Sequence, residues 1–315
     1  MIRFIIFILI IAPTVACCLE KTQSGVSAAA DRPPASSNHS TRLVLLGTGT
    51  PNADPARSGP ALAVVVNGQA YLVDCGPGIV RRAAAAHQMG IEALAVEKLT
   101  HVFITHLHSD HTLGYPDLIF TPWVLERAAP LEAFGPPGLA AMTEHILAAY
   151  HEDIAIRIDG SEPANAIGYK VNVHEITPGV VYEDRNVRVT AFPVRHGSWP
   201  HAYGFRFDTA DRSIVISGDT APCESLVKNA KGCDLLVHEV YSNAAFERRP
   251  AVWQRYHASF HTSTTELAGI ARQVQPKLLV LTHQLFWGSA PKELVAEIRQ
   301  TYDGEVRSGN DLDVY

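Results

Sequence analysis

The stretch from Thr105 to His111 constrains this chain most, because its seven residues hold three histidines and an aspartate. The apolar segment before it is typical of a buried strand. In an extended chain His106 and His108 point to the same side, and Asp110 and His111 follow where the strand gives way to a turn or a helix. This spacing can supply ligands to two neighbouring metal ions, and imidazole and carboxylate ligands suit zinc. The alternative is a histidine-rich surface loop, which the preceding strand disfavours.

Predicted strands and helices alternate along the rest of the chain, and this alternation indicates an α/β layered fold. Five predicted strands deliver a histidine or an aspartate at their ends: His106, His196, Asp219, His238 and His283. Chance would scatter such residues through helices and loops. We therefore expect their side chains to gather at one edge of the sheets and to form one site.

Two glycine-rich turns follow predicted strands in the first quarter of the chain. Gly47-Thr48-Gly49 lacks the third glycine and the helix of a dinucleotide site, so we interpret it as a tight turn near the site. Asp74 ends a strand beside Gly76. Its carboxylate either hydrogen-bonds the metal ligands or is an ordinary turn residue, and the spacing favours neither interpretation.

The N-terminus predicts export. Arg3 and the apolar run over residues 4–12 form the pattern of a signal peptide, with cleavage after Ala16. Cys17 then resembles the lipidation site of a bacterial lipoprotein, and a plain membrane anchor is the other alternative. We expect a signal peptide over 1–16, a flexible polar linker over 17–41, and a protein that is periplasmic or anchored to the membrane by lipid.

The remaining cysteines indicate free thiols, and the net charge bears on the class of binding partner. Cys75, Cys223 and Cys233 have no metal-type spacing, so we expect buried free thiols, with a Cys223–Cys233 disulfide as the alternative in an oxidising compartment. The chain has a net charge of −6 and no long basic run. This balance predicts that nucleic acid is not the partner.

The His-x-His-x-Asp-His pattern of residues 106–111 resembles the signature of the metallo-β-lactamase superfamily. Further stretches resemble its ribonuclease Z and arylsulfatase-like branch, in the family's order from Arg42 onward: 46–51, 73–76, 193–196, 217–220, 238–239, 261–263 and 281–283. The resemblance implies a four-layer αββα sandwich of two mixed sheets, formed by one metallo-hydrolase domain over 42–315. It also implies two metal ions at one edge of the sheets.

The resemblance implies two zinc ions, in preference to manganese or iron. One ion would be held by three histidines: His106, His108 and His196. The other would be held by Asp110, His111 and His283, with Asp219 bridging the two. Two neighbouring ions could share a hydroxide, because their charge lowers the pKa of the bound water.

Three residues are candidates for catalysis beyond metal binding. Asp110 could steer or accept a proton. His261 could stabilise the developing anion or protonate the leaving group, and Glu239 could orient the His261 ring. Three further histidines are weaker candidates, more often surface or supporting residues than ligands: His201, His238 and His257.

The link between the strands that end near Phe205 and Ser217 guides the prediction of substrate. Ribonuclease Z enzymes resembling this chain carry a long basic arm there that grips tRNA, whereas here only eleven residues, 206–216, separate the two positions. β-Lactamases of the superfamily usually lack a bridging carboxylate at the position of Asp219, so hydrolysis of β-lactam antibiotics is disfavoured. A catalytically dead binding protein is disfavoured too, because none of the expected metal ligands is missing from the sequence. We therefore expect an exported dinuclear zinc hydrolase of a small ester, such as an aryl sulfate ester or a phosphodiester. The alternatives are a ribonuclease Z-type tRNA 3′-endonuclease and a lactonase. The branch often dimerises, so the resemblance suggests a homodimer.

Overall fold

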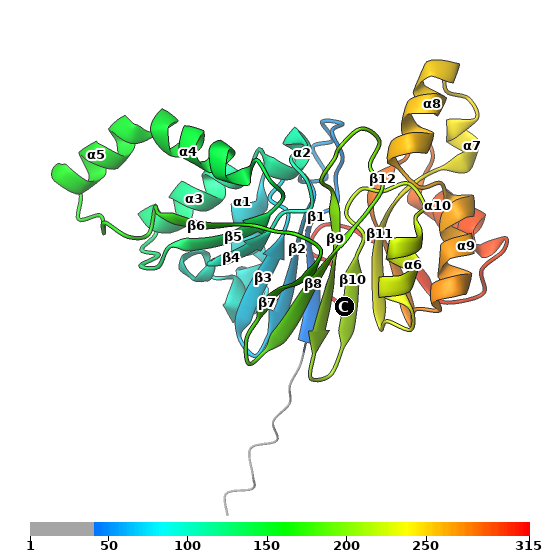
Figure 1. Ribbon diagram of the computed structural model, residues 1–315, viewed down its shortest axis with the longest axis horizontal. Coiled ribbons are helices and arrows are strands. Elements are labelled where there is room, and N and C mark those ends of the chain that lie inside the picture. Colours follow the sequence, from blue (N-terminus) through cyan, green and yellow to red (C-terminus); the bar gives the residue numbers. More distant parts are fainter. Residues whose placement is uncertain (1–40) are drawn as a thin grey trace, which may run out of the picture. The chain divides into compact units, whose positions relative to one another are not determined.

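The computed structural model describes residues 41–315 (Figure 1). The predicted signal peptide, the lipidation site at Cys17 and all but the last residue of the predicted linker lie outside this part of the chain. Thr41, that last residue, already begins the first strand. Within the described residues no helix is both long and apolar enough to cross a membrane.

The first sheet has six strands in sequence order: β1 (Thr41–Gly47), β2 (Ala61–Val66), β3 (Gln69–Val73), β4 (His101–Phe103), β5 (Leu131–Gly135) and β6 (Val171–Glu175). Strands β1 to β3 are antiparallel, and β3 to β6 run parallel. Asn67 and Gly68 form the β2–β3 turn with positive φ angles of 50° and 81°, as the Asn-Gly pair favours.

The second sheet has seven strands: β7 (Gly179–Glu183), β8 (Val187–Pro193), β9 (Tyr203–Thr209), β10 (Ser213–Ile216), β11 (Leu235–Tyr241), β12 (Leu278–Leu285) and β13 (Val306–Ser308). Their order is β13-β12-β11-β10-β9-β8-β7. Strands β10 to β13 are parallel, and β7 to β10 are antiparallel. A tight turn joins β9 to β10, closed by a hydrogen bond from the Thr209 amide to the Arg212 carbonyl.

The helices are α1 (Ile79–Gln88), α2 (Ser109–Thr112), α3 (Tyr115–Val124), α4 (Leu139–Ala149), α5 (His151–Asp159), α6 (Glu224–Ala230), α7 (Asn243–Phe246), α8 (Ala251–Phe260), α9 (Thr264–Val274) and α10 (Pro291–Arg299), with two short 3₁₀ turns at Glu92–Leu94 and Val96–Lys98. The sequence analysis did not predict α7 and α8. Helix α9 begins at Thr264, because Ser263 caps it in a capping box with Glu266.

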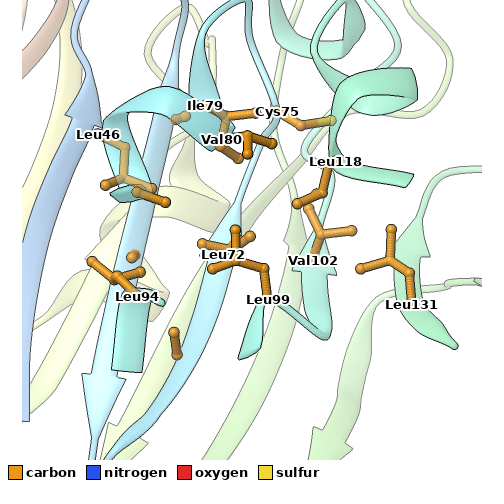
Figure 2. Packing of buried hydrophobic residues seen from close by; sticks show 14 of the residues in the cluster. Leu46, Leu72, Cys75, Ile79, Val80, Leu94, Leu99, Val102, Leu118 and Leu131 are labelled. Atoms are coloured by element: carbon orange, nitrogen blue, oxygen red, sulfur yellow. The ribbon is translucent and has the colours of Figure 1, made fainter. Parts of the chain in front are cut away.

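Three apolar clusters separate four layers. The first lies between the first sheet and helices α1 and α3, where Leu72, Val102 and Leu118 pack together (Figure 2). The second fills the space between the sheets and includes Val64 from β2 and Phe205 from β9. The third lies between the second sheet and helices α6, α9 and α10. This order confirms the predicted α/β fold, a four-layer αββα sandwich.

Candidate metal centre

The loop after β4 is built by hydrogen bonds to one aspartate. The backbone amide of Thr105 donates to Asp74 Oδ1 at 2.8 Å, two residues after β4 ends at Phe103. Asp74 itself has a positive φ of 59°, a conformation that costs an ordinary residue energy. Its carboxylate also accepts from His111 Nδ1 at 2.8 Å. Of the two interpretations left open for Asp74, the structure therefore supports the one in which it holds a candidate metal ligand.

All seven predicted metal ligands come together at one end of the strands. They are His106, His108, Asp110, His111, His196, Asp219 and His283, and they fall into overlapping groups whose ligand atoms lie within 4.8 Å of one another. His106 and His108 lie on the loop after β4, and α2 presents Asp110 and His111. The other strands deliver their residues in the turns after β8 and β10 and within β12.

The first group consists of three imidazoles around His108 Nδ1. His106 Nε2 and His196 Nε2 each lie 3.0 Å from that atom. Burial lowers the pKa of His106 well below its usual value and that of His196 to about 4. These rings are therefore neutral at pH 7, the form in which imidazole binds a metal.

Outer hydrogen bonds fix which ring nitrogen faces the centre. Thr105 Oγ1 donates to Asp74, so it must accept from His106 Nδ1 at 2.9 Å. His196 Nδ1 donates to the Phe260 carbonyl at 2.9 Å. Together with the His111–Asp74 bond, these contacts leave the Nε2 lone pairs of three histidines directed inward. The donor set therefore fits metal ions.

The second group adds carboxylates. Asp110 Oδ2 lies 3.2 Å from His283 Nε2, and Asp219 Oδ2 lies 3.4 Å from both His111 Nε2 and His283 Nε2. Burial alone would raise the pKa of Asp219, but the neighbouring His283 and His111 hold it well below its usual value. Asp219 belongs both to a group with His106 and to one with His283, as a bridging ligand would. Buried carboxylates of this kind need positive charge nearby.

His261 and Glu239 lie beside these groups. His261 Nδ1 is 3.5 Å from Glu239 Oε2 and 3.9 Å from Asp219 Oδ2. Both His261 Nδ1 and Glu239 Oε2 are buried, and neither atom has a hydrogen-bond partner among the described residues. Glu239 Oε1 accepts from the Thr262 amide at 2.9 Å, which ties the Glu239 carboxylate to the start of α9. His261 also forms a metal-capable group with Asp219 and His283. Its catalytic role stays a prediction.

The three weaker histidines lie outside the groups of candidate ligands. His238 is buried, and its Nδ1 lies 2.5 Å from the Glu239 carbonyl. His257 lies in α8 and packs on the ring of Trp287, and His201 is exposed. Cys75, Cys223 and Cys233 are free, so the alternative of a Cys223–Cys233 disulfide does not hold.

Comparisons with known proteins agree with this geometry. Residues 69–284 match the model of the Beta-lactamase superfamily domain. A ribonuclease Z from Mycobacterium bovis is 37% identical over 279 residues, which cover 86% of this chain and 96% of the relative. The human tRNase Z short form superimposes with a TM-score of 0.66 at 25% identity, covering 87% of this chain and 98% of that structure. The metallo-β-lactamase fold protein YhfI from Bacillus subtilis has a TM-score of 0.67 at 16% identity, covering 88% and 99%.

The relatives contradict the predicted substrate. An exported hydrolase of small sulfate or phosphate esters is wrong as the main function, because the similar enzymes are named for RNA and tRNA. The missing arm misled the prediction. The short 206–216 link was a weak guide, because a ribonuclease Z that is 37% identical over 96% of its length outweighs one missing segment.

The predicted partner and location are wrong for related reasons. Nucleic acid was excluded from a net charge of −6, which is a sum over the whole chain and does not describe the surface near the site. The same relatives contradict an exported, periplasmic or lipid-anchored protein, because export would separate such an enzyme from RNA. The prediction of a metal-dependent hydrolase that acts on ester bonds is confirmed.

Proposed function

This chain belongs to the beta-lactamase superfamily and, within it, to the ribonuclease Z family, and from this membership we propose that it is an endonuclease that processes the 3′ end of tRNA. The observation that carries the proposal is the 37% identity over 96% of the length of a ribonuclease Z. The match to the family model spans residues 69–284 and so includes all seven candidate metal ligands.

The fold and the His/Asp clusters indicate a dinuclear metal site, and we propose zinc as the metal. His106, His108 and His196 would hold one ion, and Asp110, His111 and His283 the other, with Asp219 shared between them. Two zinc ions, when bound, supply a nucleophile from water at neutral pH and positive charge for the developing negative charge on the phosphoryl group.

The chain's own residues position the reacting groups. Asp110 is the least buried of the candidate carboxylates, with 9% of its surface exposed, so it can reach both an incoming water proton and the second set of ligands. Burial lowers the pKa of His261 to about 4, so its ring is neutral at pH 7 and carries one N–H donor. That donor can stabilise charge on the leaving oxygen, while Glu239 sets the orientation of the ring.

A cleavage assay tests the function. Full-length protein with zinc is incubated with a precursor tRNA that carries a 3′ trailer and, separately, with bis(p-nitrophenyl) phosphate. We expect cleavage at the junction between tRNA and trailer, loss of cleavage with a chelator, and about two zinc ions per chain by elemental analysis. Hydrolysis of the aryl phosphodiester without any cleavage of the precursor would contradict the proposal.

A further inference from the structure

Helix α8 and the segment before it carry a strip of arginine and aromatic side chains that the metal centre does not use, all exposed except Arg249, which is half-buried. We call it the α8 strip and define it by five residues: Arg248, Arg249, Trp253, Arg255 and Tyr256. Trp253 is 46% exposed and Tyr256 is 36% exposed. Large aromatic side chains are seldom left open to water, and exposed ones mark surfaces that bind a partner.

The strip leads to the candidate ligands through two aromatic ladders with i, i+4 spacing, which places rings on one face of a helix. Trp253 stacks at 5.8 Å on His257, whose ring lies 5.6 Å from that of His261. Tyr256 stacks at 4.4 Å on Phe260, whose ring contacts that of His196 at 5.0 Å. The ten residues of α8 span about 15 Å. The exposed rings are thus a few nucleotides away from the centre, at the end of the strands where α2 also lies (Figure 1).

The charge around these rings is positive although the chain as a whole is negative. Arg249 lies over the Trp253 ring at 5.8 Å, and Arg255 and Arg195 line a hollow of about 760 Å³ beside Phe260. Glu247 is the one acidic residue between 243 and 260. Among residues 41–315, no carboxylate forms an ion pair with any arginine of the α8 strip, so their charge is available to a ligand.

Arginines interleaved with exposed aromatic rings match the chemistry of an unpaired nucleic-acid strand. Bases that are not paired can stack on aromatic rings, while guanidinium groups bind the phosphates between them. A protein partner would bury Trp253 equally well, but it would not by itself account for unpaired arginines on both sides of a hollow beside His196. The tight β9–β10 turn adds weight, because it leaves no arm there to hold an RNA.

Resting on the proposed function, we propose that the α8 strip binds the single-stranded nucleotides next to the scissile phosphate. The bases stack on Trp253 and Tyr256, and the phosphates contact Arg255 and, across the hollow, Arg195. The strip thereby delivers the strand to the candidate metal centre along the Tyr256–Phe260 ladder.

Binding of a short unstructured oligoribonucleotide to the full-length protein tests this directly. Trp253→Ala should weaken binding about 5- to 100-fold, since stacking contributes about 1–3 kcal/mol per base. Trp253→Phe should restore most of the affinity. Arg255→Ala should weaken binding and reduce the slope of log K against log[salt] by about 0.7. The matched control is Arg185→Ala, an exposed arginine in the β7–β8 turn at the far end of the strands, which should bind like the parent protein.

The parent protein offers a second readout, because Trp253 is one of four tryptophans and its fluorescence should be quenched by the oligonucleotide. Circular dichroism verifies that each variant is folded. Unchanged affinity in Trp253→Ala and Arg255→Ala, or equal loss in Arg185→Ala, overturns the assignment of the α8 strip. If the variants lose oligonucleotide binding but the parent protein cleaves no precursor tRNA, the strip stands and the proposed function fails.

Discussion

Asp219 links the two parts of the candidate metal centre at the scale of single residues, because it belongs to one metal-capable group with His106 and to another with His283. Asp219→Ala should remove the negative charge that two cations need, so we expect metal content and cleavage to be lost together. Elemental analysis of the purified variant measures this. Asp303→Ala, which removes an exposed carboxylate elsewhere, is the matched control. An Asp219→Ala protein that keeps two zinc ions per chain would contradict the bridging role.

His261 should behave differently, because it lies beside the centre and the other seven residues can bind metal without it. We expect His261→Ala to keep its zinc and to lose about 10²- to 10⁴-fold in kcat, the usual contribution of a positioned acid or base. Parallel measurements of zinc content and single-turnover rate separate the two properties. Loss of one zinc ion from this variant would make His261 a ligand through its group with Asp219 and His283.

The start of α9 shows at the scale of an element how local structure supports the site. Ser263 Oγ accepts from the Glu266 amide at 3.2 Å, and the Glu266 carboxylate accepts from the Ser263 amide at 2.9 Å. Ser263→Ala should lower the free energy of unfolding by about 1 kcal/mol, as loss of an N-cap usually does. Urea denaturation measures the change. Because His261 lies two residues before the cap, we also expect kcat to fall while zinc content stays unchanged.

The elements of the fold were predictable to different degrees. The positions of His106, His196, Asp219 and His283 could be found from the sequence, because apolar runs that stop at a metal-ligating residue are rare by chance. The structure extends the last of these strands past His283 to Leu285. Helix α8 could not be found, because its polar and aromatic residues give no regular apolar face, and Trp253 and Tyr256 remain exposed. The weak signal was the aromatic and basic content of residues 248–260, which the prediction did not use.

At the scale of the whole molecule, buried neutral histidines couple stability to pH. Burial lowers the pKa of His196, His238, His257 and His261 to about 4. The unfolded chain binds these protons near pH 6.5, so it takes up more protons than the folded protein between pH 6.5 and 4. The free energy of unfolding should therefore fall as the pH is lowered from 7 to 5.

His111 and His283 act in the opposite direction: burial opposes the shift, yet nearby aspartates raise their pKa values. Glu239, whose pKa is raised by burial, adds to this opposition. Burial also lowers the pKa values of His101, His106 and His108, so we expect the net effect to keep its sign. Thermal melts at pH 7, 6 and 5 measure the slope, and His257→Gln, which removes a histidine outside the ligand groups, should reduce it. A melting temperature that rises toward pH 5 would contradict this reading of the buried histidines.

The partner of the whole molecule was the property that the sequence predicted worst. The net charge of −6 sums 26 basic and 32 acidic residues and says nothing of where they lie on the surface. Arg195 and Arg255 are sixty positions apart and meet only in the folded chain, where they line one hollow. A surface assembled by folding from distant arginines leaves no basic run for sequence analysis to find.

If the chain processes tRNA as proposed, the tight β9–β10 turn has a consequence for how it measures the length of its substrate. An enzyme that binds a tRNA at a second point far from the cleavage site senses the distance between that point and the scissile phosphate. A chain with four residues at this turn, Thr209 to Arg212, has no such second point here and must judge the RNA at its end alone. A minihelix of acceptor stem plus trailer should accordingly be cleaved with nearly the kcat/KM of a complete precursor, so that discrimination lies in the shape of the end and not in the length of the molecule.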